Sequence, residues 1–264
     1  LIKQIASDLG TFEILFFRSI FTIVLIASFS YSFKLNLKFS IEKYTLIRNI
    51  LAGISIFFEV ASLEYITLTS LILLLSSAPI FIKILAYFFL KEPISIIDIC
   101  VISISTIGIL FVLDCSLKNE PVIGVVYALI GSFMYSISCI FTKKIEEPNS
   151  TEIYLIYVVV LFLISLLKLP SFLPSMNELI ILFFMAIIHI MAFFLYLKGF
   201  FILTTSRGAV LEYSGIVVAM FLDYLFWDKI PYEPQLFGGL LIFTASLLSI
   251  YREKLRLLIR VKCL

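Results

Sequence analysis

The stretch VLEYSGIVVAMFLDYLFW, residues 210 to 227, is almost entirely apolar and long enough to cross a bilayer as a helix. It nevertheless contains two carboxylates, Glu212 and Asp223. A charged side chain at the middle of a bilayer costs about 2.5 to 3.5 kcal/mol, so each buried acid needs a partner or a water-filled cavity. The stretch therefore predicts a membrane-spanning helix with a polar face.

The whole chain has the composition of a membrane protein. It is 62% hydrophobic and 14% charged, whereas soluble domains are about half apolar and a quarter charged. Apolar runs recur along its length and leave no room for a soluble catalytic domain. The net charge of +2 gives no basis for nucleic-acid binding. We expect an all-α integral membrane protein in one compact bundle.

Apolar runs separated by short polar connections define the expected helices, because a spanning segment must satisfy its own backbone hydrogen bonds. Proline-containing connections such as KEP at 91–93 and DKIPYEP at 228–234 separate several of them. Nine membrane-spanning helices are predicted, at residues 12–32, 45–66, 68–90, 94–113, 121–142, 152–168, 179–203, 208–227 and 234–251.

The distribution of basic residues predicts the orientation, because cytoplasmic loops carry an excess of Lys and Arg. Fourteen of these residues lie on the side that includes the carboxyl-terminal tail, and four lie on the other. We therefore expect a cytoplasmic carboxyl terminus. Heavy use of Ile, Phe, Lys and Asn is typical of an AT-rich bacterial genome, so the expected location is a bacterial inner membrane. The basic side comprises Arg48, loops 33–44, 91–93, 143–151 and 198–207, and the tail from residue 252.

Nine helices with a cytoplasmic carboxyl terminus place the amino terminus outside, which predicts a further apolar helix upstream and ten in the complete protein. A shift of 137 residues along the chain pairs Ser77 with Ser214 and Tyr87 with Tyr224. Two halves of five helices each must be inverted relative to one another. Inverted repeats are the architecture of many alternating-access carriers.

Four stretches carry a resemblance to a known family. The chain resembles the EamA type of the drug/metabolite transporter superfamily, collinearly over about residues 9–251, and departs from it where Glu59 and Lys83 replace usual apolar residues and Lys229 replaces a usual acid. The stretches are FEILFFRSIF (12–21), APIFIKILAYFFLKEPIS (78–95), GVVYALIGSFMYSISCIFTKK (124–144) and VLEYSGIVVAMFLDYLFWDKIP (210–231).

The resemblance implies two inverted five-helix repeats around a central cavity, with both termini in the cytoplasm. On this division, residues 1–116 form the first repeat without its first helix. Residues 121–251 form the second repeat, and residues 252–264 form a basic cytoplasmic tail.

The ionisable residues inside the predicted helices fall into two layers. Arg18 and Glu59 lie about 10 Å from the outer ends of their helices, and Lys83 and Glu212 lie about 10 Å from the cytoplasmic ends. Each layer thus contains an acid and a base. Two readings stay open, since the pairs are either cavity residues or structural ion pairs that fix helix register.

Residues three or four positions from these ionisable residues are expected to lie on the same helical face. Three helices are each predicted to turn a polar stripe toward a shared cavity, and Pro79 is expected to free a backbone carbonyl at depth. The stripes are Arg48, Ala52, Ser55, Glu59 and Ser62; Ser76, Pro79, Lys83 and Tyr87; and Glu212, Gly215, Ala219 and Asp223.

Other candidates have two readings each. His189 is either a packed core residue or a proton relay, and Asp223 lies beside Tyr224 and Trp227, which favours an interfacial position. The predicted substrate-binding residues are Arg18, Glu59, Lys83, Tyr87, Tyr135, His189, Glu212 and Tyr213.

The expected function is secondary transport of a small polar solute. No phosphate-binding G-x-x-x-x-G-K-[ST] motif is present, so direct use of ATP is not expected. The chain has one histidine, whereas a membrane enzyme would need a cluster of His, Asp or Cys side chains. The four cysteines match no zinc spacing, so neither a metal nor a cofactor is expected. The resemblance favours S-adenosylmethionine uptake, with export of an amino acid or another metabolite as the alternative. The expected partners are the solute and membrane lipid, and a homodimer is compatible with the sequence.

Overall fold

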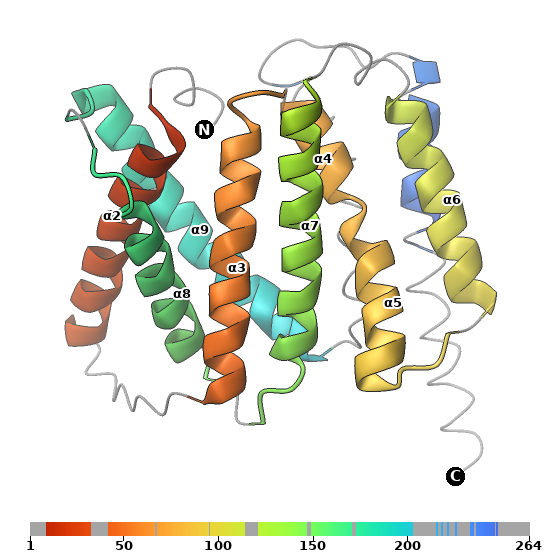
Figure 1. Cartoon of the computed structure of the whole chain (residues 1–264), viewed down its shortest axis with the longest axis horizontal. Coiled ribbons are helices and arrows are strands. Elements are labelled where there is room, and N and C mark those ends of the chain that lie inside the picture. Colours follow the sequence, from red (N-terminus) through yellow and green to blue (C-terminus); the bar gives the residue numbers. More distant parts are fainter. Residues whose placement is uncertain are drawn as a thin grey trace.

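Eight helices and part of a further helical region make up the described structure, a computed structural model (Figure 1). The helices are α2 (Thr11–Ser32), α3 (Lys43–Ser62), α4 (Leu68–Leu75), α5 (Ala78–Leu90), α6 (Ile96–Leu113), α7 (Val122–Thr142), α8 (Ser150–Ser165) and α9 (Met176–Ile202). The structure describes residues 9–32, 42–66, 68–94, 96–113, 121–146, 149–170, 173–202, 233–234 and 236–245, with residues 215, 218, 221, 225 and 247.

Most predicted helices are confirmed with ends that differ by a few residues. One is corrected, because the expected helix over 68–90 is two helices, with a break at Ser76 and Ser77 just before Pro79. Within the predicted 208–227 span only residues 215, 218, 221 and 225 are described, each of them helical, and residues 236–245 are helical in the last span.

Serines on α7 stabilise the break between α4 and α5. Pro79 lacks an N–H, so the helical hydrogen bonding is interrupted in this region. The hydroxyl of Ser132 lies 3.5 Å from the carbonyl oxygen of Leu75, and that of Ser136 lies 3.2 Å from the carbonyl oxygen of Ala78. The expected free carbonyl at depth is therefore present and has a partner on a neighbouring helix, as non-helical backbone in a membrane requires.

The middle of the bundle is the pair α3 and α7, which make the most extensive contact between described helices. In Figure 1 they stand side by side, with α2 and α8 on one flank and α4, α5 and α6 on the other. Gly131 permits this approach, because a Cβ there would lie 3.1 Å from Cγ of Glu59 and 3.2 Å from the carbonyl oxygen of Ser55. Small residues at such contacts are typical of helix packing in membranes.

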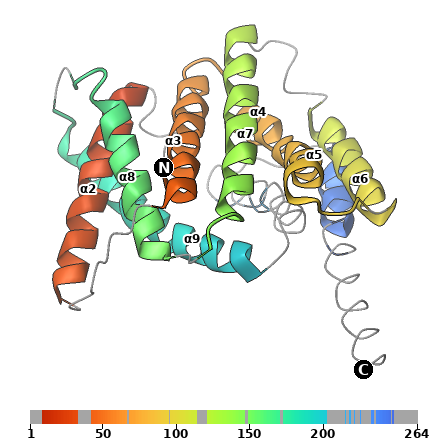
Figure 2. The same ribbon diagram turned by 60° about the horizontal axis from the view of Figure 1, so that its bottom comes forward.

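The main hydrophobic core lies between α2, α8, α9 and the adjoining face of α3. Its buried members include Leu15, Tyr154, Leu161, Leu182 and Leu197. Helix α9 runs obliquely past α8 and α3 toward the end of α7, as both orientations show (Figures 1 and 2). This crossing brings its middle turns beside the polar stripe of α3.

Capping side chains define the starts of α8 and α9. The Asn149 side chain accepts hydrogen bonds from the backbone N–H groups of Thr151 and Glu152. Ser175 and Glu178 form a reciprocal pair, in which the Ser175 N–H donates to the Glu178 carboxylate and the Glu178 N–H donates to the Ser175 hydroxyl. Such caps satisfy N–H groups that have no partner within the helix.

The helix ends alternate between the two sides of the bundle. The carboxyl ends of α2, α5, α7 and α9 lie on the same side as the amino ends of α3, α6 and α8 (Figure 1). Four described helices, α2, α3, α7 and α9, are long and apolar enough to cross a membrane. This side is the one on which the sequence concentrates Lys and Arg.

Candidate functional site

A cavity of about 250 Å³ lies where α3, α7, α8 and α9 meet. Its volume lies just below the range of about 300 to 1,000 Å³ that is usual for small-molecule sites, which are mainly apolar with a few convergent polar groups. The lining fits that description, since Ile56 and Phe193 lie among hydroxyl, imidazole, guanidinium and carboxylate groups. The polar members are Arg48, Ser55, Glu59, Tyr135, Tyr157, His189 and Tyr196.

The α3 wall of the cavity is the stripe that the sequence predicts. Arg48, Ala52, Ser55 and Glu59 follow one another at spacings of four, three and four residues, and all four line the cavity. These spacings keep side chains on one helical face. Ser62, the last member of the predicted stripe, is not among the lining residues, so the structure brings four of the five predicted positions to the cavity.

Arg48 lies at one end of the stripe and is 4% exposed. Its Nε donates to the Thr142 hydroxyl on α7 over 3.2 Å, and its Nη1 donates to Oδ1 of Asn49 over 2.7 Å. The guanidinium carbon also lies 5.1 Å from the centre of the Phe193 ring. These contacts fix the side chain without supplying a negative charge.

Glu59 lies at the other end of the stripe. The Ser55 hydroxyl lies 2.6 Å from Oε1 of Glu59 and 2.9 Å from the carbonyl oxygen of Gly131. A single hydroxyl proton serves one of these acceptors at a time. The close approach of α7 at Gly131 therefore positions both the serine and the acid.

Stacked rings form the wall opposite α3. The rings of Tyr157 and His189 are 5.8 Å apart and nearly parallel, and those of Tyr157 and Phe193 are 5.5 Å apart with similar orientation. Tyr154 is buried behind them, and its hydroxyl lies 2.8 Å from Nδ1 of His189. This wall offers flat aromatic faces with a polar atom at the imidazole.

A polar link between α7 and α9 borders the same cavity. The Tyr135 hydroxyl donates to the Tyr196 hydroxyl over 2.9 Å, and the Cys139 sulfur lies 3.5 Å from that second hydroxyl. Beyond the end of α7, the Lys143 ammonium donates to the Phe200 carbonyl, and its nitrogen lies 4.9 Å from the centre of the Phe200 ring. Burial lowers the pKa of Lys143.

Comparison with protein families decides what kind of molecule carries this cavity. The model of the EamA-like transporter family matches residues 1–114 and 122–251. The chain belongs to the EamA-like transporter family. It is a multi-pass membrane transporter and not an enzyme, and its cavity lies within the part of the chain that the family model matches.

Curated relatives and a solved structure are similar over nearly the whole chain. The S-adenosylmethionine uptake transporter of Rickettsia felis is 28% identical, with 96% of this chain and 87% of the relative covered. The protein of the same name from Rickettsia bellii is 25% identical over 96% and 88%. A protein crystal structure superposes with a TM-score of 0.73 at 16% identity, covering 95% of this chain and 94% of the other. That likeness shows a shared fold alone.

Three predicted site residues meet in the cavity, namely Glu59, Tyr135 and His189. Arg18 lies on α2, 4% exposed, and does not line the cavity. It forms no direct ion pair with Glu59 within the described residues. The structure therefore does not show Arg18 and Glu59 as a direct structural ion pair.

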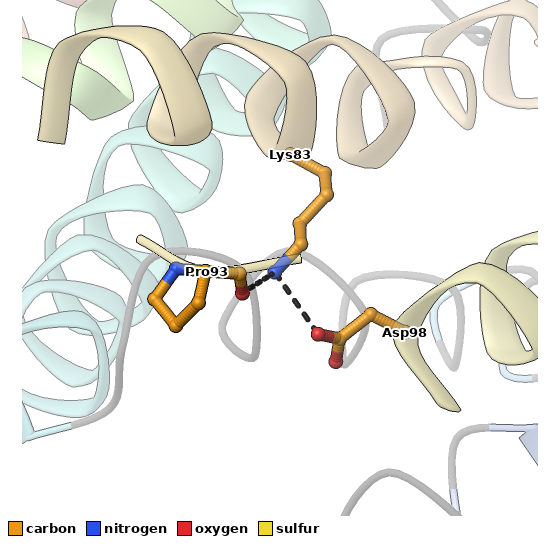
Figure 3. Close-up of polar contacts among 3 residues, drawn as sticks. All are labelled: Lys83, Pro93 and Asp98. Atoms are coloured by element: carbon orange, nitrogen blue, oxygen red, sulfur yellow. Dashed lines mark hydrogen bonds and ion pairs between the residues drawn. The ribbon is translucent and has the colours of Figure 1, made fainter. Parts of the chain in front are cut away.

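Lys83 lies elsewhere, facing the connection between α5 and α6. Its ammonium lies 3.2 Å from Oδ2 of Asp98 and 3.4 Å from the carbonyl oxygen of Pro93 (Figure 3). Tyr87, one turn along α5, is 49% exposed and packs edge to face with Phe88. Neither Lys83 nor Tyr87 lines the cavity.

Three further predictions fall outside the described residues, namely those for Glu212, Tyr213 and Asp223. The pairing of Lys83 with Glu212 and the interfacial position of Asp223 remain predictions. No group of three or more His, Cys, Asp and Glu side chains suited to a metal occurs among the residues that the structure describes.

The sequence did not single out Arg48, Tyr157 and Tyr196 as site residues. A signal existed for Arg48, because it begins the stripe that ends at Glu59, although its position near a helix end favoured counting it with the cytoplasmic charges. No comparable signal marked the two tyrosines, which are two of 13 in the chain.

Proposed function

We propose that the chain is a secondary transporter that moves a small polar metabolite across a bacterial inner membrane, with uptake of S-adenosylmethionine as the leading candidate. Nine spanning helices form two inverted repeats, residues 1–116 and 121–251. The basic tail, residues 252–264, lies in the cytoplasm. The names of the rickettsial relatives support the choice of solute, and the excess of basic residues on one side supports the orientation.

The observation that carries the proposal is the chemistry of the cavity. It combines a carboxylate at Glu59 with the aromatic faces of Tyr157 and His189, all inside an apolar bundle. Charged groups at membrane depth are costly and are typical of solute pathways. A purely structural bundle would not need a cavity lined in this way.

S-adenosylmethionine has groups that match this lining. Its ammonium and sulfonium are cationic and suit the Glu59 carboxylate, while its adenine suits stacking on a tyrosine face. Glu212 and Tyr213 are proposed to contribute from the second repeat. Lys83 and Tyr87 are left out of the proposed binding set because they lie away from the cavity.

An amino acid or a related metabolite, moved outward, is the alternative within the same family. A cavity that contains Arg48 and Glu59 offers complementary charges to any zwitterion. The sequence identity to the named relatives is 25% and 26%. A transport measurement is therefore needed to decide between the two solutes.

Uptake into proteoliposomes distinguishes these candidates. The purified chain is reconstituted, and entry of radiolabelled S-adenosylmethionine is followed with and without an excess of unlabelled S-adenosylmethionine inside the vesicles. The proposal predicts saturable entry that internal unlabelled solute accelerates by exchange, compared with protein-free vesicles. Entry of labelled amino acids with no entry of S-adenosylmethionine would favour the alternative.

A further inference from the structure

Arg48 is a buried cation with no anionic partner among the described residues. It is 4% exposed and lines the cavity. No carboxylate in the described part of the chain lies within 4.0 Å of its guanidinium. A buried charge normally has a counter-ion or access to a water-filled site, and among the described residues the guanidinium lines the cavity without a carboxylate partner.

The contacts that Arg48 does make orient it. Thr142 and Asn49 accept from Nε and Nη1, and both acceptors are neutral. The Nη2 atom makes no hydrogen bond to the described residues. The side-chain nitrogen of Asn49, in the same amide that accepts from Arg48, is itself buried and has no hydrogen-bond partner among the described residues. Donors thus remain available beside a fixed positive charge.

A guanidinium prefers planar anions that accept two parallel hydrogen bonds, which are carboxylates and phosphates. Glu59 in the same cavity disfavours an anion of higher charge, because a phosphate would meet a like charge there. A singly charged carboxylate that is joined to a cationic or amino-bearing group suits both ends of the stripe.

The spacing along α3 limits the shape of such a solute. Arg48 and Glu59 are eleven residues apart, which places their Cα atoms about 16 Å apart. The Arg48 and Glu59 side chains span part of this distance, and the carboxylate and ammonium of one amino-acid head are adjacent. A solute whose cationic group lies further from its carboxylate therefore fits the two residues better than a single head group.

We propose that Arg48 is the anion subsite of the cavity and binds the carboxylate of an elongated zwitterionic or cationic solute, while Thr142 and Asn49 act as positioning residues. This inference rests on the proposed transport function and narrows its substrate class. Arg48 supplies the binding charge, and Glu59 supplies the opposite charge at the far end of the same wall.

Matched pairs of compounds that differ only in the carboxylate test the subsite. The purified full chain is titrated with S-adenosylmethionine and its decarboxylated form, and with L-methionine and 3-(methylthio)propylamine, and apparent Kd values are taken from the rise in Tm with ligand. The carboxylate member of at least one pair should bind tenfold or more tightly. In Arg48→Gln that ratio should fall to about one, whereas Lys43→Gln, an exposed change on the same helix, should retain it.

The outcomes separate the subsite from the transported solute. Equal binding within both pairs by the unmodified protein, or no binding of either carboxylate compound, would overturn the subsite even if Arg48→Gln fails to fold. If Arg48→Gln weakens the binding of both members of a pair by the same factor, Arg48 has a structural role and does not bind the carboxylate. Discrimination in the methionine pair without S-adenosylmethionine binding would support the subsite and contradict the proposed solute. Equal binding of the two members of each pair, with S-adenosylmethionine uptake intact, would support the proposed solute and contradict the subsite.

Discussion

The Ser55 hydroxyl lies 2.6 Å from a carboxylate oxygen of Glu59, one turn further along α3 and inside the cavity. A glutamine can accept the same hydrogen bond without the charge. Glu59→Gln is therefore expected to fold normally while lowering uptake of a cationic solute by tenfold or more, about 1.4 kcal/mol.

The matched control for this change is Glu42→Gln. Glu42 precedes the same helix and makes no side-chain capping hydrogen bond, so its uptake should equal that of the unmodified protein. Uptake into proteoliposomes at equal protein density gives both values. If Glu59→Gln transports the solute as well as the unmodified protein, Glu59 has a structural role and does not bind the solute.

Gly131 controls how closely α3 and α7 pack. A methyl group there would lie 3.1 Å from Cγ of Glu59, so Gly131→Ala is expected to lower stability by about 1 to 3 kcal/mol through overpacking. Gly199→Ala on α9 is the control, because a Cβ there meets no atom within 4 Å and alanine favours helix. Thermal unfolding in detergent should show a lower Tm for the first variant alone. Equal Tm values would mean that the helices separate easily at Gly131.

The hydroxyls of Tyr135 and Tyr196 form one link between α7 and α9, so their removal should not be additive. Tyr135→Phe and Tyr196→Phe are each expected to cost about 1 kcal/mol, and the double variant should cost little more than either. Tyr127→Phe on α7 is the control, since no hydrogen bond of its hydroxyl occurs among the described residues. Additive losses in Tm would indicate that the two hydroxyls act separately.

Lys83 has two candidate acids, Asp98 from the structure and Glu212 from the sequence. Double-mutant cycles that combine Lys83→Met with Asp98→Asn or with Glu212→Gln measure each coupling. The 3.2 Å ion pair predicts a coupling of about 1 to 2 kcal/mol with Asp98. Coupling to Glu212 alone would support the sequence-based pairing over the described one.

Much of the fold follows from the sequence, because membrane helices must be apolar over a fixed length and their hydrogen bonds are internal. The break between α4 and α5 was only partly predictable. Pro79 signals a freed carbonyl, but not that Ser132 and Ser136 on a distant segment supply hydroxyl groups to the carbonyls of Leu75 and Ala78. Sequence periodicity contains no information about that partner helix.

The site likewise contains features that the sequence predicts and features that it does not. Glu59 was predictable because a carboxylate on an apolar membrane helix is costly unless it has a partner or a cavity, and its stripe follows from helical spacing. Arg18 was placed at the same depth as Glu59, yet it does not line the cavity and forms no ion pair with Glu59 among the described residues. Depth along the membrane normal can be read from sequence, whereas rotation and tilt depend on packing against neighbours.

The cavity between α3, α7, α8 and α9 is the proposed binding site of the transported solute. Ala52 lines it, and Ile50 lies about 200° away around α3 and is 42% exposed on the other side. With the four native cysteines replaced by alanine, Ala52→Cys and Ile50→Cys are compared for reaction with a water-soluble thiol reagent.

The decisive measurement is the rate of thiol modification at residue 52 with and without saturating S-adenosylmethionine. Ala52→Cys is expected to react readily, and the solute should slow its reaction by tenfold or more, while Ile50→Cys should react slowly and be unaffected by the solute. An unchanged rate at residue 52 in protein that still transports the solute, or equal protection of both positions, would contradict it.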